Sequence, residues 1–227
     1  YAVVPQQSVI PIAAHYPLDR AALVGCGVTT GVGAVINTAH VEPGSSVAVI
    51  GVGGVGLNVI QGAVLAGAER IIAIDVVPEK LEMARRFGAT DLVNAKQGDP
   101  VAAVQALTEG YGSDYAFEVI GNPTTIAQAY AMVRPAGMAV IVGLTRMDAH
   151  VPVPTGDMVR TERQLIGSFY GSSRPHVDMP KLLSLYDEGK LKLDELITRT
   201  YRLEQINEAF ADLEAGRNAR GVILFEH

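Results

Sequence analysis

Short apolar runs alternate with segments of helical periodicity through the middle of the chain. The runs at residues 46–50, 70–75, 91–94, 115–120 and 138–143 predict strands, and the segments at 54–66, 78–87, 100–108 and 123–133 predict helices. Because each strand is nearly all apolar, the sheet is expected to be covered on both faces. Alternation of strands and helices with short connections is typical of parallel pairing with right-handed crossovers. The pattern therefore predicts an α/β fold built on a doubly wound parallel sheet.

The segments on either side of this pattern predict a second, smaller lobe. The run AHVPVP at 149–154 carries proline at every second position, which suits an edge strand or a bulge. Beyond it we expect strands near 164–170 and 221–225 and helices near 180–188 and 203–216. We therefore divide the chain into residues 1–27, a sheet domain at 28–162, and a return to the smaller lobe at 163–227.

A glycine-rich turn follows the first predicted strand. Gly51, Gly53 and Gly56 match the pattern G-x-G-x-x-G, with Gly54 and Val55 between them. The first glycine permits a sharp turn, the second lets a diphosphate approach the backbone, and the third lets helix and strand pack closely. The N-terminus of the following helix offers unpaired N–H groups to the phosphates. A tight strand-to-helix turn without a ligand is the alternative interpretation of the same glycines.

An acidic residue, Asp75, closes the second strand. Its carboxylate can accept two hydrogen bonds from the adenosine ribose and would repel a 2′-phosphate, so the sequence favours NAD over NADP. Lys80 lies five residues further on and could also reach the ribose. The alternatives are that Asp75 is a helix N-cap ahead of Pro78 and that Lys80 is a solvated helix residue.

Composition and charge exclude several function classes. The 227 residues are 48% hydrophobic with a net charge of −6, which argues against nucleic acid or an anionic membrane as the partner. No run of eighteen apolar residues predicts a membrane span, and the N-terminus lacks a basic start and an apolar signal core. The single cysteine, Cys26, cannot form an internal disulfide, which fits a reducing compartment. We therefore expect a cytoplasmic protein.

A second motif places that cysteine between two glycines. The stretches GCGVTTG, VEPG, GVGGVGL, AGAERIIAID, KLEMARRFGAT, FEVIGN, IVGL and RLEQINEAFADLEAG run from residue 21 to the C-terminal region. Together they strongly resemble the zinc-dependent alcohol dehydrogenases of the medium-chain dehydrogenase/reductase superfamily. The resemblance implies a Rossmann-type NAD-binding domain with remnants of a second, GroES-like catalytic lobe.

The resemblance also implies roles for individual residues. Cys26 matches a thiolate ligand of the catalytic zinc, which acts as a Lewis acid on the alcohol oxygen before hydride passes to the nicotinamide. Thr30 matches a residue that packs against the nicotinamide, and Val55 matches one that supports the ring from behind. The other matches are Ile120 and Val142 in the cofactor groove, the Ser168 and Tyr170 backbone near the carboxamide, and Arg220 at the pyrophosphate. The alternatives are a small buried hydrophobe for Cys26, core packing for the apolar residues, and a solvated charge for Arg220.

The remaining zinc ligands of such enzymes, a second cysteine and a G-H-E segment, are not found in this sequence. The five histidines lie in other contexts. The chain is therefore expected to be the C-terminal two-thirds of an alcohol dehydrogenase, binding NAD but inactive alone, with zinc held only in the full-length parent. One alternative is a non-catalytic dinucleotide-binding fragment. Another is a zinc-free, NADPH-dependent quinone or enone reductase of the same superfamily, which Cys26 and Asp75 disfavour.

Partners follow from the same resemblance. The expected partner is a small alcohol or aldehyde substrate, which the sequence does not identify further. Related enzymes join their cofactor domains edge to edge, so we expect a homodimer or homotetramer formed through the predicted edge strand at 150–154. The prolines there remove alternate backbone donors, which suits sparse pairing.

Overall fold

The computed structural model describes residues 3–225, which form two compact units. One unit combines residues 3–29 with residues 173–225, and the other comprises residues 30–172. The division differs from the predicted boundary at 163, because the short strand Gln164–Gly167 pairs with the sheet of the larger unit. Each unit is described by itself.

The larger unit is built on a six-stranded parallel sheet with the strand order β3-β2-β1-β4-β5-β6. The strands are β1 (Ser46–Ile50), β2 (Arg70–Asp75), β3 (Asp91–Asn94), β4 (Ser113–Glu118), β5 (Val133–Ile141) and β6 (Gln164–Gly167). The predicted α/β, doubly wound parallel fold is confirmed. Two of the predicted strands extend further toward the N-terminus, because β4 and β5 pair through Ser113 and Val133 before a register shift.

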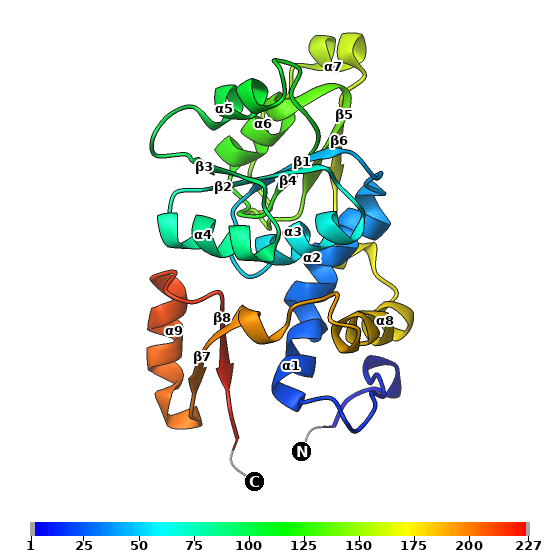
Figure 1. Ribbon diagram of the computed structural model, residues 1–227, viewed down its shortest axis with the longest axis vertical. Coiled ribbons are helices and arrows are strands. Elements are labelled where there is room, and N and C mark those ends of the chain that lie inside the picture. The colour runs from blue at the N-terminus through cyan, green and yellow to red at the C-terminus, as the bar shows by residue number, and fades with distance from the viewer. Residues whose placement is uncertain (1–2, 226–227) are drawn as a thin grey trace. The chain divides into compact units, whose positions relative to one another are not determined.

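Helices cover both faces of this sheet. They are α3 (Gly56–Leu65), α4 (Pro78–Phe87), α5 (Pro100–Leu107), α6 (Pro123–Met132) and α7 (Thr155–Thr161). Figure 1 shows α3 and α4 on one face and α5 and α6 on the other. Each of α4, α5 and α6 begins with proline, which lacks the N–H group that a first helical turn cannot use.

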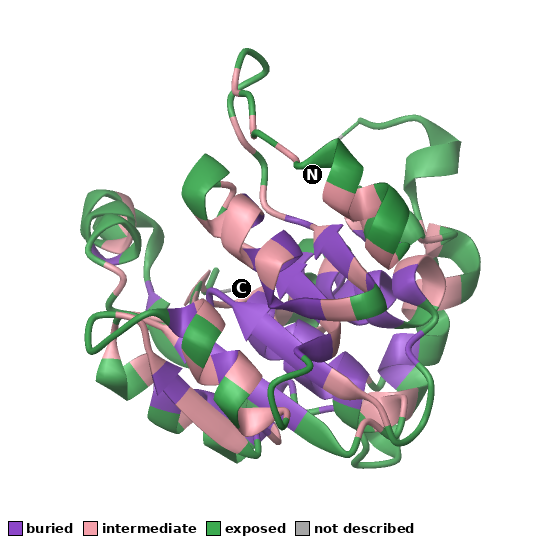
Figure 2. Cartoon of the chain, turned by 90° about the horizontal axis from the view of Figure 1, so that it is seen from above, coloured by how far each residue is buried: buried purple, intermediate pink, exposed green. Residues whose placement is uncertain are grey.

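The strands alternate between two buried layers, as the pleat requires. Ala48 and Ile50 of β1 belong to a cluster that includes Val104 of α5 and Ala129 of α6. The intervening residues of β1 are also fully buried, and Figure 2 shows burial concentrated along the strands. Ile50 is the last residue of β1 and pairs with Ile74 on one side and Glu118 on the other. The central strand therefore ends between two acidic residues, Asp75 and Glu118.

Asp114 ties three strands together at their amino ends. Its carboxylate accepts hydrogen bonds from the N–H and hydroxyl of Ser46 at 2.7 and 2.6 Å, and from Nε of Arg134 at 2.7 Å. Burial alone would raise the pKa of Asp114, but the bonds from Ser46 and Arg134 bring it below its ordinary value. The charged form is thus the one that the folded chain stabilises.

We expect Asp114→Asn to lower the free energy of unfolding by about 1–3 kcal/mol at neutral pH, since donors are left poorly matched. Because the folded-state pKa is depressed, the wild-type advantage is complete above the unfolded-state pKa of about 3.9 and is lost as the pH falls through the folded-state value. Urea unfolding across that pH range measures both effects. The control is Asp148→Asn, whose side chain is 69% exposed beside Arg146. A wild-type advantage that does not vary with pH would contradict the assignment.

The predicted edge strand at 150–154 is wrong. These residues form no strand, and β6 is the edge of the sheet on that side. Alternating proline removes the donors that a ladder needs, whereas Gln164–Gly167 can supply them to β5. Assembly through residues 150–154 stays a prediction.

The smaller unit contains helices α1 (Leu18–Leu23), α8 (Pro175–Asp187) and α9 (Ile206–Glu214), and a two-stranded parallel sheet of β7 (Ile197–Tyr201) and β8 (Arg220–Ile223). Short 3₁₀ turns occur at Gln6–Ser8, Asp194–Leu196 and Leu203–Gln205, and another at Tyr170–Ser172 in the larger unit. The predicted helix at 180–188 begins earlier, at Pro175, and keeps Pro180 inside it. The strand β7 lacks an apolar run and was not predicted.

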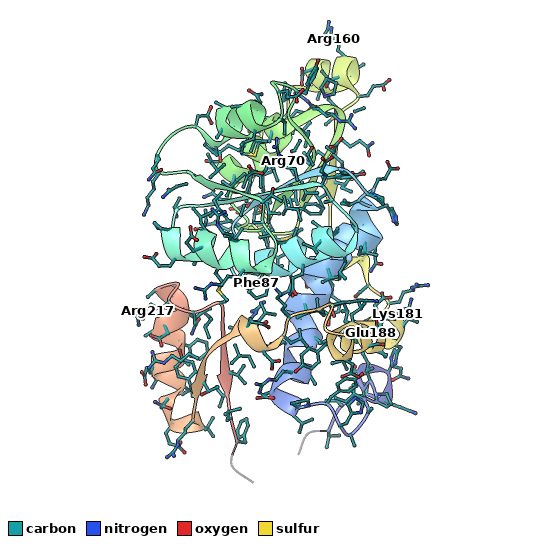
Figure 3. The ribbon with its side chains drawn as sticks, in the orientation of Figure 1. Arg70, Phe87, Arg160, Lys181, Glu188 and Arg217 are labelled. Carbon is teal, nitrogen blue, oxygen red and sulfur yellow. The ribbon has the colours of Figure 1, made fainter. Side chains whose placement is uncertain are left out.

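A buried carboxylate fastens α9 to this small sheet. Asp212, 2% exposed, accepts a 2.6 Å hydrogen bond from the Tyr201 hydroxyl and a 2.7 Å bond from Nε of Arg217, which is labelled in Figure 3. Arg199 of β7 also pairs with Asp212. The hydrogen bonds from Tyr201 and Arg217 lower the pKa of Asp212 from its ordinary value. The charge is thus held by two partners from β7 and one from the loop after α9.

One continuous helix runs from Leu18 to Ala39. It combines α1 with α2 (Thr29–Gly33) and with wider π-type turns at Val24–Val28 and Ala34–Ala39. By length and composition alone it could cross a membrane, but half of its most apolar window is buried. Buried core helices pass the same test, so the helix is weak support for a membrane span.

Candidate functional site

The candidate site lies at the carboxyl edge of the six-stranded sheet. In the order β3-β2-β1-β4-β5-β6 the chain leaves β1 toward β2 on one side and enters β4 on the other. This reversal is a topological switch point, where open α/β sheets place their ligands. The connections after β1, β2, β4, β5 and β6 all begin at this edge. The sequence-predicted residues 51–56, 75, 120, 142, 168 and 170 lie on these connections or at the strand ends.

The three motif glycines have different surroundings. Gly51 has a φ of +88°, and its N–H donates to the carbonyl of Ile74 at 2.9 Å, so it makes the sharp turn. A Cβ added at Gly56 would overlap the carbonyl oxygen of Gly51, which explains the close approach of α3 to β1. A Cβ added at Gly53 would meet no protein atom within 4 Å. The open space at Gly53 is where a ligand can approach the backbone.

The turn presents four consecutive N–H groups without partners among the described residues. The amides of residues 53–56 donate no hydrogen bond, whereas Leu57 already donates to Gly53 at 2.9 Å. Buried or half-buried amides normally find acceptors. Four free donors at the start of α3, with the positive end of the helix dipole, form a favourable site for an anion.

Asp75 lies beside this turn, and backbone N–H groups already use part of the hydrogen-bonding capacity of its carboxylate. Oδ2 accepts the N–H of Val52 at 3.0 Å, and Oδ1 accepts those of Val76 and Val77 at 2.7 and 3.1 Å. A carboxylate has about four acceptor positions, so about one remains for a ribose hydroxyl. The N-cap of α4 is Val77, without a side-chain bond, so the alternative interpretation of Asp75 as that cap is wrong.

The other predicted residues of the larger unit lie around the same edge or nearby. Ile120 is 53% exposed just after β4, and Val142 is 8% exposed just after β5. Thr30 is half-buried on α2, and Lys80 is half-buried on α4. Ser168 and Tyr170 follow β6, and Tyr170 has a left-handed φ of +52°. The structure therefore brings the strand-end residues to one edge.

A hydroxyl cluster fixes the connection after β6. Thr38 Oγ1 lies 2.8 Å from the Ser168 hydroxyl and 2.8 Å from that of Ser172, while the side-chain amide of Asn37 donates to the Gly171 carbonyl at 3.2 Å. Sequence reasoning did not find these partners, because they are 130 or more positions apart. It also missed Glu118, although an acidic residue closing an apolar strand is the same signal that singled out Asp75.

Cys26 and Arg220 lie together in the smaller unit. Cys26 is exposed, which rules out the alternative that it is a buried hydrophobe. Arg220 packs against the backbone at Gly27, where an added Cβ would overlap its guanidinium. Burial lowers the pKa of the Arg220 guanidinium, and the neighbouring Cys26 partly opposes that shift. Among the described residues Arg220 therefore lacks a carboxylate partner, as an arginine kept for an anion would.

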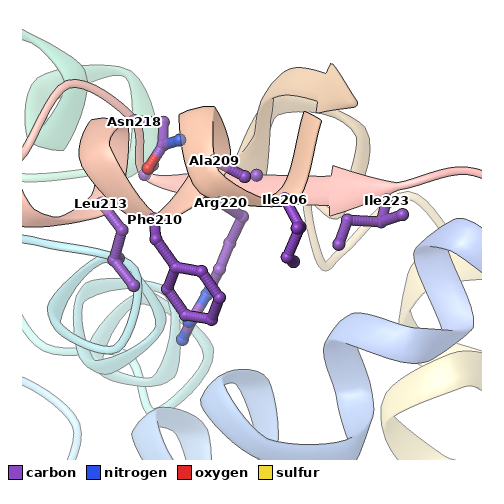
Figure 4. A pocket seen from close by; sticks show the side chains of 9 residues that line it. Ile206, Ala209, Phe210, Leu213, Asn218, Arg220 and Ile223 are labelled. Carbon is purple, nitrogen blue, oxygen red and sulfur yellow. The ribbon is translucent and has the colours of Figure 1, made fainter. Parts of the chain in front are cut away.

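Arg220 also lines a pocket of about 220 Å³ within the same unit. Figure 4 shows its side chain passing the ring of Phe210, with Leu213 and Asn218 nearby. Phe210 and Leu213 are 57% and 60% exposed. The guanidinium thus lies beside apolar side chains rather than in bulk water. The lower local dielectric constant strengthens any interaction that it makes with an anion.

Comparison with known proteins identifies the family. A family model described as zinc-binding dehydrogenase matches residues 54–188, from the glycine turn to the end of α8. The chain belongs to the zinc-binding dehydrogenase family. It is 40% identical over 233 residues to the class-3 alcohol dehydrogenase of Cereibacter sphaeroides, covering 99% of this chain and 62% of that protein. It is 38% identical to the S-(hydroxymethyl)glutathione dehydrogenase of Paracoccus denitrificans, with the same coverage of 99% and 62%.

Solved structures agree with this assignment. The benzyl alcohol dehydrogenase of Acinetobacter calcoaceticus superposes with a TM-score of 0.92 at 32% identity, over 96% of this chain and 59% of that one. The dehydrogenase chain described here thus spans about three-fifths of the length of these relatives.

The family description raises the question of zinc. Catalytic zinc uses about three protein ligands. Within residues 3–225, no group of three or more histidine, cysteine, aspartate and glutamate side chains is placed to hold a metal ion. Cys26 alone is the wrong donor set, so the described residues do not fit a catalytic zinc. The glycine turn, by contrast, fits a dinucleotide: its amides at 53–56 have no partner within residues 3–225, and its central glycine faces open space.

Proposed function

We propose that this zinc-binding dehydrogenase chain binds NAD and forms the coenzyme-binding portion of an alcohol dehydrogenase. The observation that carries the proposal is the set of four unpartnered amides at residues 53–56, beside the open space at Gly53. When bound, NAD supplies the hydride acceptor for alcohol oxidation. The chain supplies the diphosphate cradle at the glycine turn and an acceptor for the adenosine ribose at Asp75.

The relatives' names support a proposal for the chemistry of the whole enzyme. They include an alcohol dehydrogenase, an S-(hydroxymethyl)glutathione dehydrogenase and a benzyl alcohol dehydrogenase. We infer an alcohol or thiol-adduct alcohol as the substrate class. In the full-length parent Cys26 would be one zinc ligand, and Arg220 would meet the pyrophosphate. The cytoplasmic location and the homodimer or homotetramer belong to the same proposal.

A second candidate function is dinucleotide binding without turnover by this chain alone. It is favoured by the lack, within residues 3–225, of a grouped donor set for zinc. The two proposals are compatible, as a fragment and its parent enzyme, and an assay of NADH formation from benzyl alcohol tests whether this chain alone lacks turnover. We expect no turnover by the chain, and turnover equal to that of a full-length relative would overturn this part of the proposal. The remaining hypothesis, an NADPH-dependent enone reductase, predicts that the chain binds NADPH more tightly than NADH.

The direct test is a titration with NADH and NADPH followed by nucleotide fluorescence. The chain contains no tryptophan, so tryptophan emission does not overlap the signal. We expect saturable NADH binding and at least tenfold weaker NADPH binding, a difference of about 1.4 kcal/mol. Failure to bind NADH, with the fold intact by circular dichroism, would refute the proposed function.

Asp75→Asn is expected to reduce the preference for NADH over NADPH by about tenfold, because it removes the negative charge that faces a 2′-phosphate. Asparagine keeps one side-chain oxygen, so the backbone bonds from Val76 and Val77 can persist. Asp91→Asn, at the amino end of β3, is the matched control and should leave the preference unchanged. An unchanged ratio in Asp75→Asn would show that Asp75 does not select the cofactor.

A further inference from the structure

Glu118 is a fully buried carboxylate at the end of β4, with 0% exposure. No ion pair with a lysine, arginine or histidine is formed by Glu118 in the part of the chain that the structure describes. Its oxygens instead accept the N–H groups of Ile120 at 3.0 Å and Gly121 at 2.9 and 3.1 Å, and the Thr125 hydroxyl at 2.7 Å. A charge without a counterion is costly to bury unless such donors satisfy it. The carboxylate and the turn after β4 therefore fix each other.

This turn lies directly against the glycine turn. The position of a Cβ on Gly51 would be 2.5 Å from Cγ1 of Ile120, so the Ile120 side chain packs directly on the backbone of the glycine turn. On the other side, Gly121 has a φ of +85° and packs against the backbone of Gly143 and Leu144. The turn held by Glu118 thus separates the glycine turn from the connection after β5.

The turn held by Glu118 leaves the side chain of Ile120 partly exposed. Ile120 remains 53% exposed although its side chain packs on the buried Gly51 and its backbone lies against the half-buried Gly143. A side chain in that position can offer an apolar wall to a ligand at the switch point. Its place depends on two hydrogen bonds to one buried carboxylate, donated by its own N–H and by that of Gly121.

We propose that Glu118 is a positioning residue for the dinucleotide: it holds Ile120 at the wall of the cofactor groove without touching the cofactor. The inference rests on the proposed function, since it assumes that NAD occupies the carboxyl edge of the sheet. If Glu118 only stabilised the fold, the effect of its substitution on NADH affinity would be independent of the effect of substituting Ile120.

The test begins with Glu118→Gln and an NADH titration. The glutamine amide places its own donors where N–H groups now point at an acceptor, so the turn must shift. We expect NADH to bind about tenfold more weakly. The matched control is Asn122→Ala, which removes the N-cap bond to Thr124 at 2.8 Å on α6. It should lower the melting temperature while leaving the NADH dissociation constant within about twofold of wild type.

A double-mutant cycle with Ile120→Ala measures the coupling between the two substitutions in NADH affinity. Simple destabilisation of the fold by Glu118→Gln would not produce such coupling. If Glu118 acts through Ile120, the double variant should bind NADH only about as weakly as the weaker single variant. Losses that multiply, or Glu118→Gln binding like wild type, would overturn the positioning role. Failure of the wild-type chain to bind NADH would instead overturn the proposed function on which it rests.

A milder variant covers the case in which Glu118→Gln does not fold. Thr125→Val removes one donor to Oε1 and leaves the carboxylate and its backbone bonds in place. We expect the NADH dissociation constant to rise about threefold. A dissociation constant equal to that of wild type would then count against the proposal.

Discussion

Replacing Gly53 with valine is expected to weaken NADH binding by about 100-fold or more, roughly 2.7 kcal/mol, without lowering the melting temperature. The reason is the contrast between free and bound states. A Cβ at this position meets no protein atom within 4 Å, and the backbone needs no left-handed φ, so the free protein tolerates a side chain. In the proposed complex, however, the diphosphate approaches the backbone through that space.

A graded series measures the effect. Gly53→Ala should weaken binding by about tenfold and Gly53→Val by more, since the occupied volume increases while the free fold is unchanged. Isothermal titration gives the affinity, and thermal unfolding of the same samples gives the stability. Wild-type affinity in Gly53→Val would show that the ligand, if any, does not lie over this residue. A large loss of stability would show that the open space is closed in the free protein.

The second large effect concerns Gly56, where stability rather than binding should fail. Alanine has the higher helix propensity by about 1 kcal/mol, so local preference alone favours the substitution. The added Cβ would nevertheless overlap the carbonyl oxygen of Gly51, which belongs to the backbone and cannot rotate away. Separating α3 from β1 exposes a buried contact, and we expect a net loss of about 3 kcal/mol.

Urea unfolding of Gly56→Ala and Gly98→Ala makes this comparison. Gly98 lies outside the helices and strands, and an added Cβ there meets nothing within 4 Å. The control should therefore stay within about 0.5 kcal/mol of wild type. Equal stability of the two variants would mean that α3 does not press on the turn as closely as the structure indicates.

The sheet was largely predictable because its signals are local. Continuous apolar runs bounded by glycine and proline located β1, β2 and β3, and proline at the first helical position located α4 to the residue. The geometry of the glycine turn was predictable for the same reason, while its binding of NAD stays a prediction. Its three glycines have distinct physical roles that depend on neighbours within the motif or on the next strand.

Other features could not be predicted because they depend on distant residues. The helix Leu18–Ala39 was not predicted because glycine at positions 25, 27, 31 and 33 has low helix propensity. At Gly27, Gly31 and Gly33 that propensity is overridden by close packing against distant residues. Alternating proline at 150–154 is a local signal for an edge strand, whereas the pairing with β5 that makes β6 the edge of the sheet depends on distant residues. The importance of Glu118 depends on burial, which only the folded chain reveals.

The acidic end of β2 beside Gly51 has a consequence for which anions the proposed site at the glycine turn would retain. A small free anion such as inorganic phosphate gains only the amide dipoles, and it does so next to the unneutralised charge of Asp75. A dinucleotide brings neutral sugar hydroxyls to that carboxylate on the same molecule as its phosphates, so each attachment raises the effective concentration for the next. Tethering, rather than the strength of any one contact, then decides which metabolites occupy the edge of the sheet.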